Sequence, residues 1–131
     1  MSLFQLNPFT SHSGLTLPFK IECDALTEDD WEALAAVAVP MLPPFTHVFG
    51  VPLGGMKFES ALAKHVAQEP QPHRVLVCDD VLTTGASMEK ARAQYPAAHV
   101  IGLVAFARGD WPSWVTPIFA LRGCKQKEPV T

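Results

Sequence analysis

A nearly unbroken apolar strand that ends in two adjacent aspartates constrains this chain more than any other feature. The strand, residues 74–78 (R-V-L-V-C), is almost entirely apolar, which is typical of a strand covered on both faces in a parallel sheet. Helix-like segments surround it, from residue 56 to about 66 and from 86 to about 94. Strands that alternate with helices connect by right-handed crossovers into a mostly parallel sheet. The sequence therefore predicts an α/β fold.

The remaining segments extend this pattern toward both ends of the chain. Residues 15–23 alternate apolar and polar side chains, which predicts a strand with one buried face. Thr27 and Asp30 have the spacing of a capping box, and the helix that follows should end at Pro40. Further strands are predicted at residues 46–51, 99–106 and 116–121. We expect one three-layer α/β domain over residues 1–131, with a mostly parallel sheet of about four to five strands flanked by helices.

The charge and cysteine content exclude several classes of protein. Lys and Arg total 10 against 13 Asp and Glu, a net charge of −3 that predicts no nucleic-acid partner and no membrane partner. No apolar run reaches the roughly 20 residues that span a bilayer, and the N-terminus lacks the features of a signal peptide. The cysteines, Cys23, Cys78 and Cys124, form no C-x-x-C pair, which indicates reduced thiols. We therefore expect a cytoplasmic protein.

The loop that follows the apolar strand carries the groups that bind phosphate. Thr83, Thr84 and Ser87 provide hydroxyl donors where the next helix should begin. The start of a helix exposes main-chain N–H groups and a partial positive charge, so an anion placed there is stabilised. Gly85 lets the backbone approach the anion closely, and the small Ala86 follows it. These five residues predict a phosphate site; a plain helix N-terminus with threonine caps is the alternative interpretation.

Two acidic residues, Asp79 and Asp80, precede the phosphate loop. Their carboxylates would repel a phosphate, so they suit neutral hydroxyl groups, such as those of a ribose, or a magnesium ion. Hydroxyls at one end and a phosphate at the other describe a ribose 5-phosphate. Neighbouring side chains of a strand point to opposite faces, so we expect the chain to turn at Asp80 and bring both acids to one ligand. Solvated aspartates are the alternative.

Residues 75–87, V-L-V-C-D-D-V-L-T-T-G-A-S, resemble the motif with which type I phosphoribosyltransferases bind 5-phosphoribosyl-1-pyrophosphate (PRPP). The resemblance implies that the acidic pair holds the ribose hydroxyls and that the T-T-G segment cradles the 5-phosphate. It also implies that Mg²⁺ arrives with PRPP, near Asp79 and Asp80, rather than on a metal site of the protein. The fold implied is phosphoribosyltransferase-like, with a minimal N-terminal hood over the base.

The run V-P-L-G-G, which contains Pro52, Leu53, Gly54 and Gly55, resembles the pyrophosphate loop of the same family. That loop often carries a non-proline cis peptide, and its glycines let backbone amides meet the diphosphate. A plain strand-to-helix turn is the alternative. Lys57 follows the loop and is the best placed cation for the leaving pyrophosphate, although it could equally be a solvated lysine in the first turn of a helix.

Weaker similarities concern the orotate phosphoribosyltransferase branch. Residues 9–14 and 18–21 are similar to the segment that helps form the hood over the base in that branch. Lys20 and Arg108 match base-contacting positions, with a solvated surface charge as the alternative for each. Because the chain is short and the hood small, we also expect a homodimer to complete the site.

The chain departs from the family in one respect. The family inserts a long flexible loop before the PRPP strand, whereas only about residues 67–73 are available here. Displacement of pyrophosphate builds negative charge that cations and water exclusion must stabilise. Two functions are therefore expected: PRPP-dependent transfer of ribose 5-phosphate to a base such as orotate, or PRPP or nucleotide sensing without turnover. A structural protein with a relic site is the third alternative.

Overall fold

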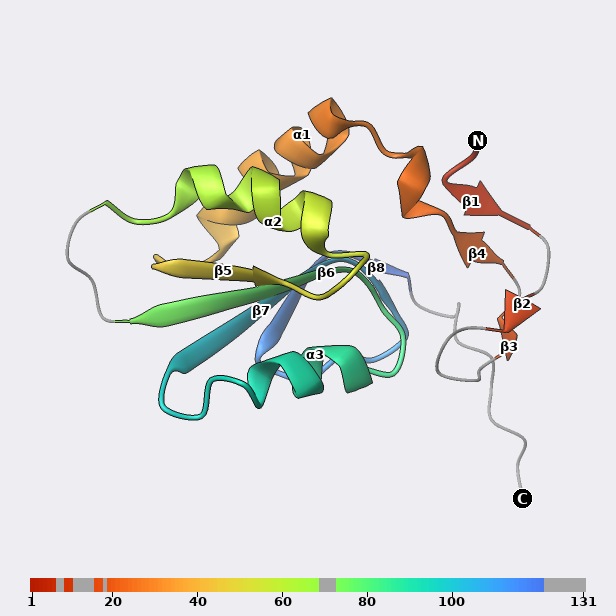
Figure 1. Ribbon diagram of the computed structural model, residues 1–131. Helices are drawn as coiled ribbons and strands as arrows, with labels where there is room; N and C mark the ends of the chain where they lie inside the picture. Colours follow the sequence, from red (N-terminus) through yellow and green to blue (C-terminus); the bar gives the residue numbers. More distant parts are fainter. Residues whose placement is uncertain (7–8, 11–15, 18, 69–72, 122–131) are drawn as a thin grey trace, which may run out of the picture.

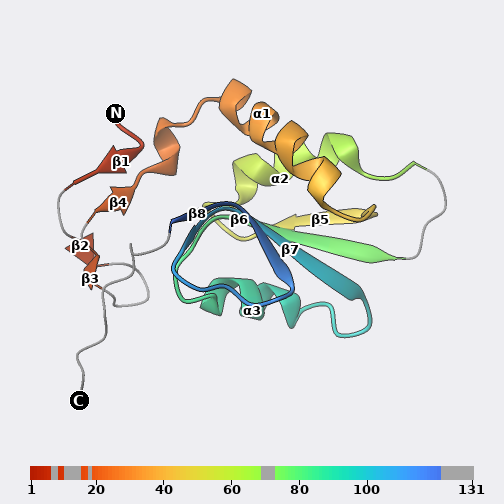
Figure 2. The same ribbon diagram turned by 180° about the vertical axis from the view of Figure 1, so that it is seen from behind.

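The computed structural model describes residues 1–6, 9–10, 16–17, 19–68 and 73–121. Its centre is a four-stranded sheet in the order β5-β6-β7-β8, in which all neighbouring strands run parallel. Helices α1 and α2 cover one face of this sheet and α3 covers the other, as Figure 1 shows from the front and Figure 2 from behind. The strands are β5 (His47–Gly50), β6 (Arg74–Leu82), β7 (His99–Arg108) and β8 (Val115–Leu121); the helices are α1 (Glu28–Ala38), α2 (Met56–Leu62) and α3 (Ala86–Arg92). The predicted three-layer α/β architecture is confirmed.

Two apolar clusters hold the three layers together. On the side of α1 and α2, the rings of Trp31 and Phe58 lie 5.1 Å apart and pack over the sheet residue Leu76. On the side of α3, Met88 packs against Val77. All five side chains are at most 2% exposed. Burying a large apolar side chain contributes about 1.5–3 kcal/mol, so these contacts fix the helices against the sheet.

The capping box predicted before α1 is present. Asp30 donates its N–H to Thr27 Oγ1 at 3.1 Å, and its carboxylate accepts the Thr27 N–H at 2.8 Å. Such a cap contributes about 1 kcal/mol to helix stability. The helix ends at Ala38, where a short 3-10 helix (Val39–Met41) contains Pro40. A second 3-10 helix (Ala63–His65) continues α2, so the helix predicted to end near residue 66 is an α-helix for only part of its length.

The prediction of one strand over residues 15–23 is wrong. The structure has two short strands there, β3 (Thr16–Leu17) and β4 (Lys20–Ile21), with a bend at Phe19 between them. Strand β3 pairs with β2 (Phe9–Thr10) and β4 with β1 (Phe4–Gln5), both antiparallel. Cys23 already belongs to a 3-10 helix (Cys23–Ala25). Different partners for the two halves explain the break, and the four short strands form the hood at the carboxyl end of the sheet (Figure 1).

The turn expected at Asp80 is also wrong. Strand β6 continues past Cys78 to Leu82, and β7 pairs with it on both sides of Asp80, Asp79 with Val104 and Val81 with Phe106. The alternation of faces changes instead. Cys78 and Val81 pack on the side of α1 and α2, whereas Leu82 packs on the side of α3. Pairing with β7 thus keeps the backbone of β6 extended, while the alternation of its side chains between the two faces of the sheet shifts by one residue.

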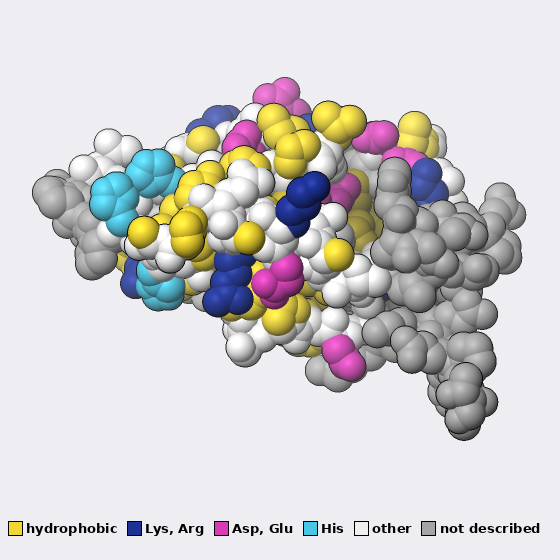
Figure 3. Space-filling view, turned by 60° about the horizontal axis from the view of Figure 1, so that its bottom comes forward, with side chains coloured by type: hydrophobic (Ala, Val, Ile, Leu, Met, Phe, Trp, Pro, Cys, Tyr) yellow, Lys and Arg dark blue, Asp and Glu magenta, His cyan; other side chains and the backbone are white. Residues whose placement is uncertain are grey.

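The opposite end of the sheet is polar and rich in histidine. His47 and His99 begin β5 and β7, and His73 directly precedes β6. The rings of His47 and His73 stack at 5.3 Å, and the histidine side chains gather at one end of the molecule in Figure 3. The same view shows lysine and arginine side chains dispersed over the face rather than gathered in one patch. In the described residues, no helix is long and apolar enough to cross a membrane.

Candidate functional site

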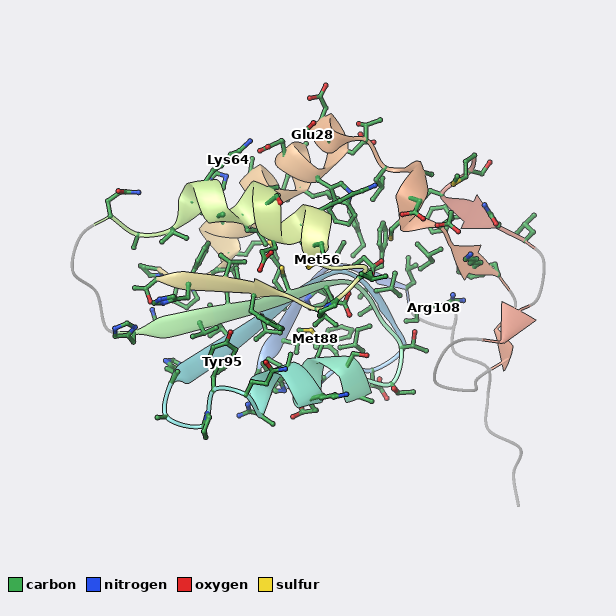
Figure 4. All side chains as sticks on the ribbon, in the orientation of Figure 1. Glu28, Met56, Lys64, Met88, Tyr95 and Arg108 are labelled. Atoms are coloured by element: carbon green, nitrogen blue, oxygen red, sulfur yellow. The ribbon has the colours of Figure 1, made fainter. Side chains whose placement is uncertain are left out.

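A cleft of about 470 Å³ opens at the carboxyl ends of the parallel strands, between the loops that follow β5 and β6 and strand β4 of the hood. Small-molecule sites typically occupy roughly 300–1,000 Å³ and lie at this end of an open α/β sheet. Figure 4 places Arg108 at this end, between the sheet and the hood. The cleft is lined by Lys20, Ile21, Val51, Pro52, Leu53, Gly54, Asp79, Asp80, Val81, Leu82, Thr83, Thr84, Gly85, Ala86, Ser87, Met88 and Arg108.

The loop between β6 and α3 presents bare main-chain N–H groups to this cleft. Gly85 has φ +86°, a left-handed conformation that glycine adopts without strain, and the space beside its Cα is open. Ala86 donates its N–H to Thr84 Oγ1 at 3.3 Å. Within the described part of the chain, the N–H groups of Thr84, Gly85 and Ser87 have no hydrogen-bond partner. Thr83 completes the wall, so all five residues of the predicted phosphate site line the cleft.

The two aspartates lie beside this loop and interact closely. Asp80 donates its N–H to Asp79 Oδ1 at 2.8 Å, and Val81 donates its N–H to Asp80 Oδ1 at 2.7 Å. Asp79 is only 7% exposed. Burial, and then the negative charge of Asp80, raise the pKa of Asp79 to about 8. Hydroxyl donors or a cation in the cleft would favour the ionised form, so the pair is suited to such ligands.

The loop between β5 and α2 forms the facing wall. A cis peptide joins Pro52 to Leu53, as the resemblance to the pyrophosphate loop implied. Gly55 is buried and donates its N–H to Val51 O at 2.7 Å. The N–H groups of Leu53 and Gly54 have no partner among the described residues. Two main-chain donors are therefore available at the cleft, while Gly55 supports the loop and does not line it.

Two basic side chains line the hood end of the cleft. Arg108 is 1% exposed, and its guanidinium carbon lies 4.4 Å from the ring centre of Phe19. Lys20 Nζ lies 2.6 Å from Glu22 Oε2, and this hydrogen bond and charge raise the pKa of Lys20. The interpretation of Arg108 as a solvated surface charge is thus wrong. Among the described residues, these are the two cations that line the cleft.

The predicted Lys57 lies elsewhere. It is exposed in the first turn of α2 and does not line the cleft. Lys64, at the other end of the same helical segment, pairs with Glu32 of α1. Figure 4 shows Lys64 on the outer layer, beside α1. No lysine or arginine among the described lining residues therefore belongs to the β5–α2 loop.

Some residues that line the cleft were assigned no role from the sequence, although all of them except Met88 stand in the motifs quoted above. Apolar surface is added to the lining by Ile21, Val51, Val81, Leu82 and Met88. Each stands next to a predicted residue in the sequence, but an apolar residue gives no chemical signal of its own. Within the described residues, no group of three or more His, Cys, Asp or Glu side chains could hold a metal ion.

Comparison with known proteins identifies the fold. No protein-family model and no curated protein matches the chain by sequence. Among solved structures, the orotate phosphoribosyltransferase from Aeropyrum pernix superposes with a TM-score of 0.71 and 21% identity, covering 91% of this chain and 88% of that one. The chain has the phosphoribosyltransferase fold. The orotate phosphoribosyltransferase of Mycobacterium tuberculosis H37Rv gives a TM-score of 0.64 and 16% identity, covering 90% of this chain and 89% of that one.

The same fold also matches a solved phosphoribosyltransferase that is named for a different base. The adenine phosphoribosyltransferase from Leishmania donovani gives a TM-score of 0.61 and 15% identity, covering 92% of this chain and 76% of that one. Sequence identities this low support a shared fold but not a shared substrate. The resemblance to type I phosphoribosyltransferases seen in the sequence is therefore confirmed in the fold, including its likeness to the orotate branch.

Proposed function

We propose that this chain transfers a ribose 5-phosphate group from PRPP to a nitrogenous base and releases pyrophosphate, with orotate or another pyrimidine as the first candidate. The observation that supports this most is the convergence of three separate sequence motifs on one cleft. Gly54 of the β5–α2 loop, Asp79 and Thr84 of the PRPP motif, and Arg108 at the end of β7 all line it. Each motif supplies the chemistry that one part of PRPP or its acceptor requires.

The phosphate end of the substrate is assigned to the β6–α3 loop. Thr83, Thr84 and Ser87 offer hydroxyls, and Gly85 and Ala86 bring the backbone close to the anion. Hydrogen bonds to a charged group contribute about 1.5–3 kcal/mol each. Several of them anchor the 5-phosphate firmly and leave the anomeric carbon free to move toward the base.

The ribose is assigned to Asp79 and Asp80. Their carboxylates accept hydrogen bonds from the 2- and 3-hydroxyls and stabilise the positive charge of an oxocarbenium-like transition state. Magnesium fits here as well, because Mg²⁺ is usually held by one or two carboxylates together with substrate phosphates. When carried in by PRPP it would neutralise charge on the diphosphate, close to these two acids.

Bond changes in the proposed reaction take place between the two walls. A ring nitrogen of the base forms a bond to the anomeric carbon and gives up its proton to water. The bond from that carbon to the pyrophosphate oxygen breaks, and its electron pair leaves with pyrophosphate. Pro52 shapes the β5–α2 loop, whose Leu53 and Gly54 N–H groups receive the departing pyrophosphate. Arg108 and Lys20 face the base at the hood end. Gly55 supports the loop through the hydrogen bond from its N–H to Val51 O.

Lys57 is retained as a proposed contact for the leaving pyrophosphate. It is exposed and stands two residues after Gly55, so its long side chain is close to the loop in sequence. Replacing it with alanine should lower the rate of pyrophosphate release with little change in stability. Lys64→Ala is the matched control, because Lys64 pairs with Glu32 on the outer layer. Equal rates for both variants and the wild type would remove Lys57 from the mechanism.

A homodimer is proposed to complete the site. Leu53, which lines the cleft, is 88% exposed, and Met56 of α2 is 43% exposed, so both apolar side chains lack cover from the described residues. We also propose a cytoplasmic location. Cys23 and Cys78 are free and buried, and burial raises the pKa of both thiols, as expected for unreactive cysteines in a reducing compartment.

A second function, sensing of PRPP or a nucleotide without turnover, is favoured by one observation. The cations among the described lining residues, Lys20 and Arg108, both lie at the hood end and not at the pyrophosphate loop. Pyrophosphate release with Mg²⁺, PRPP and a panel of bases, orotate first, separates the two functions. Transfer predicts release with at least one base. PRPP binding with no release for any base supports sensing, and no PRPP binding overturns both.

A further inference from the structure

Glu59 of α2 connects the two ends of the proposed pyrophosphate loop. Its Oε1 accepts the N–H of Gly50, the last residue of β5, at 3.0 Å. Its own N–H donates to Gly55 O, at the end of the loop, at 2.9 Å. One residue thus holds the point where the chain enters the loop and the point where it leaves.

The packing around these bonds leaves no spare room. A Cβ on Gly50 would lie 2.8 Å from Glu59 Cβ and 2.5 Å from Gly55 O, so the end of β5 is pressed against the start of α2. Val51 donates its N–H to Cys78 O at 2.8 Å, which fixes the same point to β6. The loop cannot shift at its base without breaking one of these contacts.

The consequence of this arrangement is seen at the tip of the loop. Gly55 uses its N–H internally, on Val51 O, and Pro52 has none. Leu53 and Gly54 are left with N–H groups that have no partner in the described residues. Glu59 itself does not line the cleft, so any effect it has on a ligand is transmitted through the loop.

A carboxylate in the first turn of a helix also has an ordinary explanation, since it favours the positive end of the helix dipole by a small amount. The hydrogen bond to Gly50 is different, because it joins α2 to the strand before the loop. The negative charge of Glu59 also reaches Cys78 in the middle of β6, where it adds to burial and Asp79 in raising the pKa of that thiol. The Glu59 side chain therefore links α2 to the end of β5 at the point where the loop begins.

We propose that Glu59 is the positioning residue of the pyrophosphate subsite, holding the β5–α2 loop so that the Leu53 and Gly54 N–H groups face the cleft. This inference rests on the proposed function, because it assumes that the loop receives pyrophosphate. It concerns neither the ribose nor the 5-phosphate. It therefore predicts that loss of Glu59 affects one ligand and spares the other.

The test compares two ligands on the full-length chain by calorimetry with Mg²⁺: inorganic pyrophosphate and ribose 5-phosphate. Glu59→Ala should weaken pyrophosphate binding about tenfold, through the disordered loop donors, and leave ribose 5-phosphate binding unchanged. Glu59→Gln keeps an oxygen acceptor for Gly50 and should retain affinity within about twofold. Thr84→Val should show the reverse selectivity, because its hydroxyl belongs to the other loop.

Controls separate this inference from the proposed function. Glu28→Ala removes an exposed first-turn acid from α1, which Figure 4 shows on the outer layer, and should change neither affinity. If Glu59→Ala does not fold, Glu59→Asp shortens the reach to Gly50 and gives the same comparison. Suppose that the wild type binds both ligands. If Glu59→Ala, or Glu59→Asp in its place, then loses affinity for neither ligand or equally for both, the inference alone is overturned. Wild type that binds neither ligand overturns the proposed function, and the inference with it.

Discussion

Gly54 lies directly against the carboxylate of Asp80: a Cβ on Gly54 would stand 2.5 Å from Asp80 Oδ2. The contact joins the loop after β5 to strand β6, so the proposed pyrophosphate and ribose subsites share one boundary. A residue larger than glycine at position 54 would have to displace either the loop or the acid. This relationship explains why the loop is glycine-rich at its tip as well as at its base.

Gly54→Ala should weaken binding of pyrophosphate and of PRPP. The added methyl group meets the Asp80 carboxylate, and the loop must move away from the cleft to relieve the contact. Thermal stability should change little, because Gly54 is exposed and its loop is at the surface. Calorimetric titration measures the effect, with Gly85→Ala as a comparison that strains the other loop at φ +86°. Full pyrophosphate affinity in Gly54→Ala would contradict the role assigned to this contact.

The free energy of unfolding should fall less with rising pH in Asp79→Asn than in the wild type. Burial raises the pKa of Asp79 to about 8, so the folded chain holds a proton that the unfolded chain releases near pH 4. The contribution of Asp79 to stability is complete below that pH and is lost as the pH rises through about 8, by up to about 1.4 kcal/mol per pH unit. Asparagine carries no such proton.

Urea unfolding of the wild type and Asp79→Asn between about pH 4 and 9 measures this difference. The stability of the wild type relative to the variant should fall over that range. Asp30→Asn is a suitable control, since Asp30 is exposed and acts in the cap of α1. Parallel curves for wild type and Asp79→Asn would contradict the burial argument.

Arg108→Lys should impair use of the base more than binding of PRPP. Lysine keeps the positive charge but loses the planar group that lies 4.4 Å from the ring centre of Phe19. We expect kcat/KM for the base to fall by about tenfold or more, with the PRPP affinity within about twofold of wild type, because Arg108 is assigned to the hood end. Steady-state kinetics at saturating PRPP measures the first quantity. A matched loss of PRPP affinity would place Arg108 at a different part of the substrate.

The phosphate loop and the central sheet could be predicted because their signals are local. Gly85 with its neighbouring hydroxyls marks a helix start, and the apolar run before Asp79 marks a buried parallel strand. Thr27 and Asp30 likewise form a cap within four residues of sequence, and the structure contains it. Each of these features leaves a signal in neighbouring residues of the sequence, even where distant strands complete it, as β5 and β7 do for β6.

The predictions that were wrong concerned features set by contacts between distant segments of the chain. Asp80 does not start a turn, because pairing of Val81 with Phe106 keeps β6 extended. The strand expected over residues 15–23 divides because its halves find different partners, Phe4–Gln5 and Phe9–Thr10. The burial of Arg108 under Phe19 has the same origin, since the hood that covers it lies far away in sequence. None of these contacts leaves a local pattern.

Titration of the purified chain with Mg²⁺ and PRPP, with and without the double substitution Asp79→Asn and Asp80→Asn, tests the central claim most directly. If acidic side chains hold the ribose beside a main-chain phosphate site, the wild type binds PRPP and the double variant loses most of that affinity while still folding. PRPP affinity that is equal in both proteins would contradict the account.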